Sequence, residues 1–160
     1  MEIIQMSPLD AAEHIAAFIA QTIKTYETEQ LGQKPFNVFP GFLPEWKSRK
    51  EQQDNCPAIA VHPSQVIDNE NESHSVISVL VCTYDDDMKH GHSSLYQILE
   101  YLRAALLTEK RVGQKFYIME DVKTIIPAEQ PFPRWWGQID INVSLPQPMC
   151  DYSTIWGDEP

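Results

Sequence analysis

The sequence predicts an α/β protein of the α+β type, with a mixed, mainly antiparallel sheet and two helices packed on one face. Two segments have the three- and four-residue apolar spacing of amphipathic helices. Several others have the composition or the two-residue alternation of strands. A chain of 160 residues is long enough for a single domain, residues 1–160, with its own hydrophobic core. The apolar content of 42% excludes a largely disordered chain.

The first predicted helix runs from Pro8 to about Tyr26. Ser7 is its predicted N-cap, Pro8 suits the first helical position, and Asp10 stands at capping-box spacing. The second predicted helix covers residues 93–107, with Ser93 or His92 as its cap. The predicted apolar stripes are Ala12, Ile15, Ile19, Ile23 and Tyr26 on the first helix, and Leu95, Ile98, Leu99, Leu102 and Leu106 on the second.

The predicted strands differ in their patterns. Residues 76–84 are apolar at nearly every position, which predicts a central strand buried on both faces. Residues 57–67 are predicted to form an edge strand, because Pro63 cannot donate to a ladder. Residues 138–145 alternate between apolar and polar side chains, as in an antiparallel strand with one dry face. Two shorter strands are expected at residues 115–119 and 122–126.

Residues 27–57 are predicted to be a long loop or arm rich in aromatic residues and proline. Its prolines exclude a helix or a central strand over residues 35–46. Long irregular segments in compact domains are usually functional or disordered, and the aromatic content argues against disorder. The segment is therefore either a loop that caps its own core or an arm that packs on a neighbouring subunit. Residues 146–160 are predicted to be a proline-rich C-terminal tail.

The charge balance limits the class of partner. The chain has 12 basic and 23 acidic residues, a formal net charge of −11. This excludes a surface that binds duplex DNA through clustered lysines and arginines, although DNA can pass such a surface without adhering. The apolar runs are too short to span a bilayer, so no membrane partner is expected. Three widely spaced cysteines, Cys56, Cys82 and Cys150, indicate unpaired thiols in a reducing compartment.

Residues 85–92 contain the strongest candidate for chemistry. Three consecutive aspartates are followed by His90 and His92, and Asp86 could join these histidines around a divalent ion. The spacing matches no known ligand motif, and acidic side chains before a helix are favoured by its dipole. We therefore expect a solvated acidic turn, with no catalytic, cofactor-binding or metal-binding residues. A small metal-dependent hydrolase that uses this cluster is the alternative.

Residues 129–137 form a second unusual junction. Two prolines restrict its backbone, and it ends in Trp135, Trp136 and Gly137. Tryptophan is enriched at interfaces, but either indole could equally close the local core.

The order of elements over residues 76–145, with this proline- and aromatic-containing junction leading into the last long strand, resembles the tail terminator proteins of long-tailed bacteriophages. The resemblance covers about half of the chain and is a pattern of elements. Those proteins are small α/β subunits that form a ring on the finished tail tube. The family has no active site to transfer, so the resemblance implies a structural protein and no enzyme.

The resemblance implies a homo-oligomeric ring, a hexamer, that caps the tail tube and joins it to the head-side connector protein. The tail tube protein and the connector are the implied partners, and DNA passes through without specific binding. The implied location is the virion tail, assembled in the host cytoplasm. Another phage neck or minor tail component is the alternative within this class. The candidate subunit-interface residues are Phe36, Phe39, Phe42, Trp46, Trp135 and Trp136.

Overall fold

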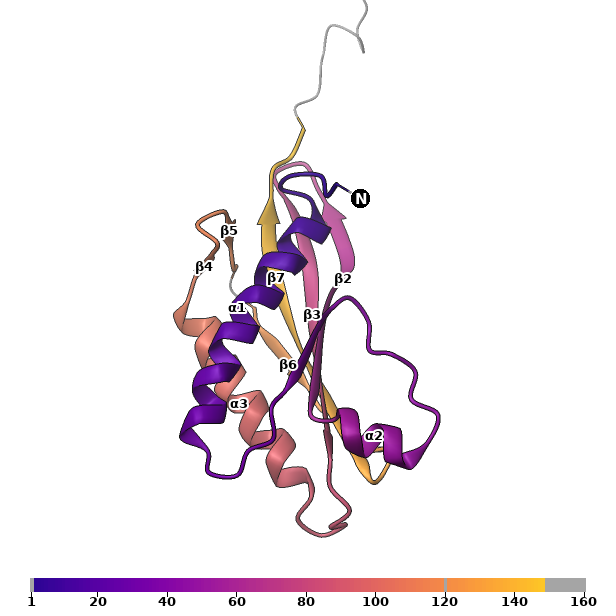
Figure 1. Ribbon diagram of the computed structural model, residues 1–160. Coiled ribbons are helices and arrows are strands. Elements are labelled where there is room, and N and C mark those ends of the chain that lie inside the picture. Colours follow the sequence, from indigo (N-terminus) through magenta and orange to yellow (C-terminus); the bar gives the residue numbers. More distant parts are fainter. Residues whose placement is uncertain (1, 120, 149–160) are drawn as a thin grey trace, which may run out of the picture.

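The computed structural model describes residues 2–119 and 121–148, and in this part of the chain it confirms the α+β class (Figure 1). A five-stranded sheet has the strand order β1-β2-β3-β7-β6, in which β1 is parallel to β2 and the other neighbours are antiparallel. Its strands are β1 (Asn37–Pro40), β2 (Ala58–Asp68), β3 (Ser73–Tyr84), β7 (Arg134–Leu145) and β6 (Lys123–Ile125). A small second sheet pairs β4 (Arg111–Val112) with β5 (Phe116–Tyr117).

Helix α1 (Pro8–Glu29) begins as predicted and extends three residues further than expected. The Ser7 hydroxyl accepts a hydrogen bond from the backbone N–H of Asp10, so the predicted N-cap is confirmed. The Asp10 carboxylate in turn accepts from the backbone N–H of Met6 at 2.8 Å. All five residues of the predicted apolar stripe are buried.

Helix α3 (His92–Thr108) buries the five leucine and isoleucine residues that were predicted. The predicted caps, Ser93 and His92, are wrong. Gly91 is the N-cap, and no side chain caps this end. A Cβ atom on Gly91 would lie 2.5 Å from the carbonyl oxygen of Asp87 and 2.9 Å from Nε1 of Trp135. The preceding turn folds so closely against the helix end that only glycine fits there.

The prediction of a central strand at residues 76–84 is confirmed, since β3 lies between β2 and β7. The prediction of an edge strand at residues 57–67 is wrong, because β1 pairs with the first four residues of β2. Pro63 lies beyond this pairing and is followed by a bulge between Pro63 and Gln65. A proline there removes no hydrogen bond to β1.

Residues 27–57 are more regular than predicted. They contain the end of α1, the edge strand β1 and a third helix, α2 (Arg49–Asn55). None of the prolines of this segment lies within α2, and Ser48 caps it by accepting from the backbone N–H of Glu51 at 3.1 Å. None of the residues of α2 is buried.

Strand β7 begins four residues earlier than predicted, because Arg134 already pairs with Tyr84 of β3. The two preceding strands are shorter than predicted. The first of them, β5, pairs with β4 outside the main sheet, although Ile118 just after it bridges to Val143 of β7.

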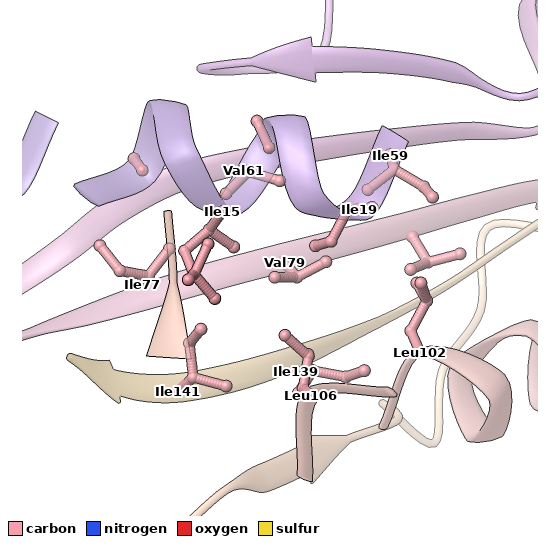
Figure 2. Close-up of a cluster of buried hydrophobic side chains, with 14 of the residues drawn as sticks. Ile15, Ile19, Ile59, Val61, Ile77, Val79, Leu102, Leu106, Ile139 and Ile141 are labelled. Atoms are coloured by element: carbon pink, nitrogen blue, oxygen red, sulfur yellow. The ribbon is translucent and has the colours of Figure 1, made fainter. Parts of the chain in front are cut away.

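The register of the main sheet assembles the core. Val79 of β3 pairs with Val61 on one side and Ile139 on the other, and Ile77 pairs with Ile141. Paired residues point to the same face, so these side chains gather together. Side chains of α1 and α3 join the same buried cluster, as Figure 2 shows for Ile15, Ile19, Leu102 and Leu106. Gly137 lets α3 pack close to β7, since a Cβ atom at position 137 would lie 2.8 Å from Cδ1 of Leu99.

An ion pair attaches the β4–β5 hairpin to the start of α1. Nζ of Lys115 lies 2.9 Å from Oδ2 of Asp10, whose side chain is 7% exposed. The hydrogen bond from Lys115 lowers the pKa of the Asp10 carboxyl, while burial acts in the opposite direction.

Ile141→Ala is expected to lower the free energy of unfolding by about 2–5 kcal/mol, because it leaves a cavity in a fully buried part of the core. Its neighbour Asn142 donates only an exposed hydrogen bond, so the matched variant Asn142→Ala should cost less than about 1 kcal/mol. Urea unfolding of both variants is the measurement. Equal losses would contradict the assignment of the two faces of β7.

The Asp10–Lys115 pair predicts a loss of stability in acid. The folded state holds the pKa of Asp10 below its unfolded value, so the unfolded chain binds more protons in the acid range. This contribution is present above about pH 4 and is lost as the pH falls through the folded pKa. In Asp10→Asn, thermal melting should therefore change less with pH in this range than in the wild type. Glu13→Gln, the same charge change on α1, should keep the wild-type pH profile.

Candidate functional site

The main sheet has a second face, opposite the core cluster, that carries several apolar side chains. Phe39 pairs with Ala60, Ala60 with Leu80, and Trp136 with Cys82. The alternation of side chains places all of them on this face. The name second face is used below for the following residues: Phe39, Ala58, Ala60, His62, Ser78, Leu80, Cys82, Trp136, Gln138 and Asp140. Its alanines and Cys82 are buried, whereas Phe39, Leu80 and Trp136 are half-buried.

The six predicted interface residues occupy different environments. Phe36 and Trp135 pack against the core of their own subunit, with the Phe36 ring at the edge of Tyr26. Phe39 and Trp136 lie on the second face, and Trp46 is half-buried in the coil before α2. Phe42 is 76% exposed, and its ring stacks on His62 with centroids 4.3 Å apart. Their role in an interface stays a prediction.

The proline-aromatic corner and the acidic turn, which are far apart in sequence, form one structure. The backbone N–H of Asp85 donates to the carbonyl of Pro133, and Nε1–H of Trp135 donates to the carbonyl of Asp85, both at 2.9 Å. The Gln130 side chain accepts from the backbone N–H of Trp136 and donates to its carbonyl. Trp135 therefore closes the junction between β3, α3 and β7, and the corner is rigid where β7 begins.

The acidic turn uses its carboxylates to order its own backbone. Oδ1 of Asp85 accepts from the backbone N–H of Asp87, and Oδ1 of Asp87 accepts from the N–H groups of Lys89 and His90. The hydrogen bond from the His90 N–H lowers the pKa of Asp87. Within residues 2–119 and 121–148, no three acidic, histidine or cysteine side chains converge as a metal site.

The second face is polar around Asp140 of β7, away from Phe39 of β1. Oδ1 of Asp140 accepts from the Ser78 hydroxyl at 2.7 Å and from the Gln138 side chain at 3.0 Å. These bonds hold a carboxylate between β3 and β7 on the face that also carries Trp136. The second face is therefore apolar beside Phe39 and polar beside Asp140, where Lys123 of β6 pairs with Asp140.

The sequence did not reveal that Cys56 and Cys82 meet. Their Sγ atoms are 3.4 Å apart, although the two residues are separated by 26 positions. The contact arises because Ala58 pairs with Cys82, which brings Cys56, two residues before β2, beside the end of β3. Alternation within β3 places Cys82 on the second face, but it does not predict the partner strand.

Comparison with known proteins identifies no relative: no family model matches the chain, and no curated protein matches it significantly. Among the helices of the described residues, none is long and apolar enough to cross a membrane.

Titration calorimetry with zinc, manganese and magnesium is expected to show no stoichiometric binding. The reason is that carboxylate oxygens of Asp85 and Asp87 are already bonded to the backbone of the turn. A tight single site that is lost in His90→Ala would contradict this expectation and would favour the hydrolase alternative.

Proposed function

We propose that this chain is the ring-forming tail terminator subunit of a long-tailed bacteriophage. The observation that carries the proposal is the succession of central strand, acidic turn, helix, short strands, proline-aromatic corner and last long strand, which resembles the order of elements in that family. The corner is joined to the central strand by hydrogen bonds, so it is an integral part of the fold. On this proposal the role of the protein in the tail is structural, and capping of the tube involves no covalent chemistry.

The second face and the adjoining coil are the proposed contact with the neighbouring subunit. Phe42 is largely exposed, and Phe39 and Trp136 each leave part of an aromatic ring uncovered. Exposed aromatic groups that stand on a rigid sheet are typical of protein interfaces. A ring needs head-to-tail contacts between unlike surfaces that close by rotation. The partner surface on the adjacent subunit is left to experiment.

The charge supports passage of DNA through the proposed ring. A net charge of −11 disfavours adhesion of a polyanion. The tail tube protein and the head-side connector protein are the proposed partners at the two rims of the ring.

The test is addition of the purified protein to growing tail tubes of the same phage, with tube length scored by electron microscopy. Wild-type protein should stop growth and appear as a ring at the tube end. Tubes that continue to grow would contradict the proposal. Binding to the connector without any effect on tube length would indicate another neck component.

Phe42→Asp is expected to abolish ring formation, because it places a charge where an apolar contact is proposed, and to leave thermal melting nearly unchanged. Leu31→Asp is the matched control, since Leu31 is fully exposed and lies outside the second face and the coil that follows β1. Sedimentation velocity, with and without tubes, measures assembly. Rings of Phe42→Asp that equal those of the wild type would remove Phe42 from the interface.

A further inference from the structure

Two buried thiols lie in contact at the end of the main sheet. Cys56 precedes β2 and Cys82 lies near the end of β3, with Sγ atoms 3.4 Å apart. Both are free thiols, and they are 2% and 1% exposed. Cysteine packs well as a small apolar residue, so burial of one thiol needs no functional explanation. Direct contact between two is different, because a disulfide needs only a modest further approach of the sulfur atoms.

Cys56 faces a cavity. It lines a pocket of about 310 Å³ between the ends of α1, β2 and β3, and Cys82 is not among the residues that line this pocket. The same pocket is lined by Lys34 and Thr83. Thr83 is 5% exposed, and its hydroxyl has no hydrogen-bond partner within the described residues. The pocket has room for a molecule as small as hydrogen peroxide beside Cys56.

The environment also makes the two thiols unequal. The hydrogen bond with Cys82 lowers the pKa of Cys56, and the positive charges of Arg134 and Lys34 act in the same direction. The pKa of Cys82 is raised by the same hydrogen bond and by burial. Burial acts against the lowering of the Cys56 pKa, and the position of Cys56 at the pocket makes it the sulfur that an entering molecule meets first.

We propose that Cys56 and Cys82 form a peroxide-reactive dithiol site, in which Cys56 is the attacking sulfur and Cys82 the resolving one. The Cys56 thiolate attacks one oxygen of hydrogen peroxide, the O–O bond breaks, and hydroxide leaves as Cys56 becomes a sulfenic acid. The Cys82 sulfur then attacks the Cys56 sulfur. An S–S bond forms, the S–O bond breaks, and the oxygen departs as water with the proton of Cys82. Two thiols are oxidised to one disulfide, and one peroxide is reduced to water.

This inference is independent of the proposed role in tail assembly. It depends on the contact between the sulfurs and on the pocket beside Cys56. In the reducing compartment expected from the cysteine content, the site stays reduced until peroxide is present.

The test uses the full chain with Cys150→Ser, which removes the third thiol. After treatment with hydrogen peroxide, thiol titration of the denatured protein should show that both remaining thiols are lost. Intact mass should fall by two hydrogens, and dithiothreitol should restore both thiols. The melting temperature of the oxidised form should rise by about 5 °C or more, because the crosslink restricts the unfolded chain. Thiols that survive peroxide would overturn the proposal.

Single-cysteine variants assign the roles. In Cys82→Ala, Cys56 should stop at the sulfenic acid, which dimedone traps as an adduct at that residue. In Cys56→Ala, Cys82 should react with neither peroxide nor dimedone while the protein is folded. Thermal melts verify that both variants fold. If either variant fails to fold, the loss of both thiols in the Cys150→Ser protein after peroxide treatment still tests the proposal. Dimedone labelling of Cys82 in Cys56→Ala would overturn the assignment of the attacking sulfur.

Discussion

The alignment of β3 between β2 and β7 is the constraint on which the rest of the molecule depends. Val79 stands between Val61 and Ile139, and this single register determines the face of every neighbouring side chain. A slip of one residue would move the core isoleucines to the second face and would bring Gln138 and Asp140 against the helices. The contact of the two thiols and the meeting of the corner with the acidic turn follow from the same alignment.

The sequence predicts the elements whose burial is one-sided. The stripes of α1 and α3 and the alternation of residues 138–145 are local patterns, because each element meets apolar surroundings on one side only. Strand β1 could not be predicted, since it is short, contains proline and pairs in parallel with a strand about 20 positions away. The cap of α3 was missed for a similar reason. Gly91 is required by the nearby carbonyl of Asp87 and also by Trp135, which lies more than 40 residues later in the chain.

The surroundings of the candidate interface residues also could not be predicted from local sequence. Phe36 and Phe39 are the same residue type in the same segment, yet one packs on the core and the other lies on the second face. Likewise, Trp135 packs on the core and Trp136 lies on the second face. Composition indicates that such aromatic side chains tend to be buried. Only their position relative to the strand register tells whether other residues of this chain bury them. Phe42 differs from the others, since its ring has His62 on one side and solvent on the other.

Gly137 limits how the core can be redesigned. The missing side chain lets Leu99 of α3 come within 2.8 Å of the place where a Cβ atom would stand, and the carbonyl oxygen of Ile125 lies 3.3 Å from that place. A larger residue at position 137 would require the buried Leu99 side chain and the backbone of β6 to shift. Redesign can therefore exchange other core residues for ones of similar volume, but a side chain at position 137 has to be combined with a smaller residue at position 99.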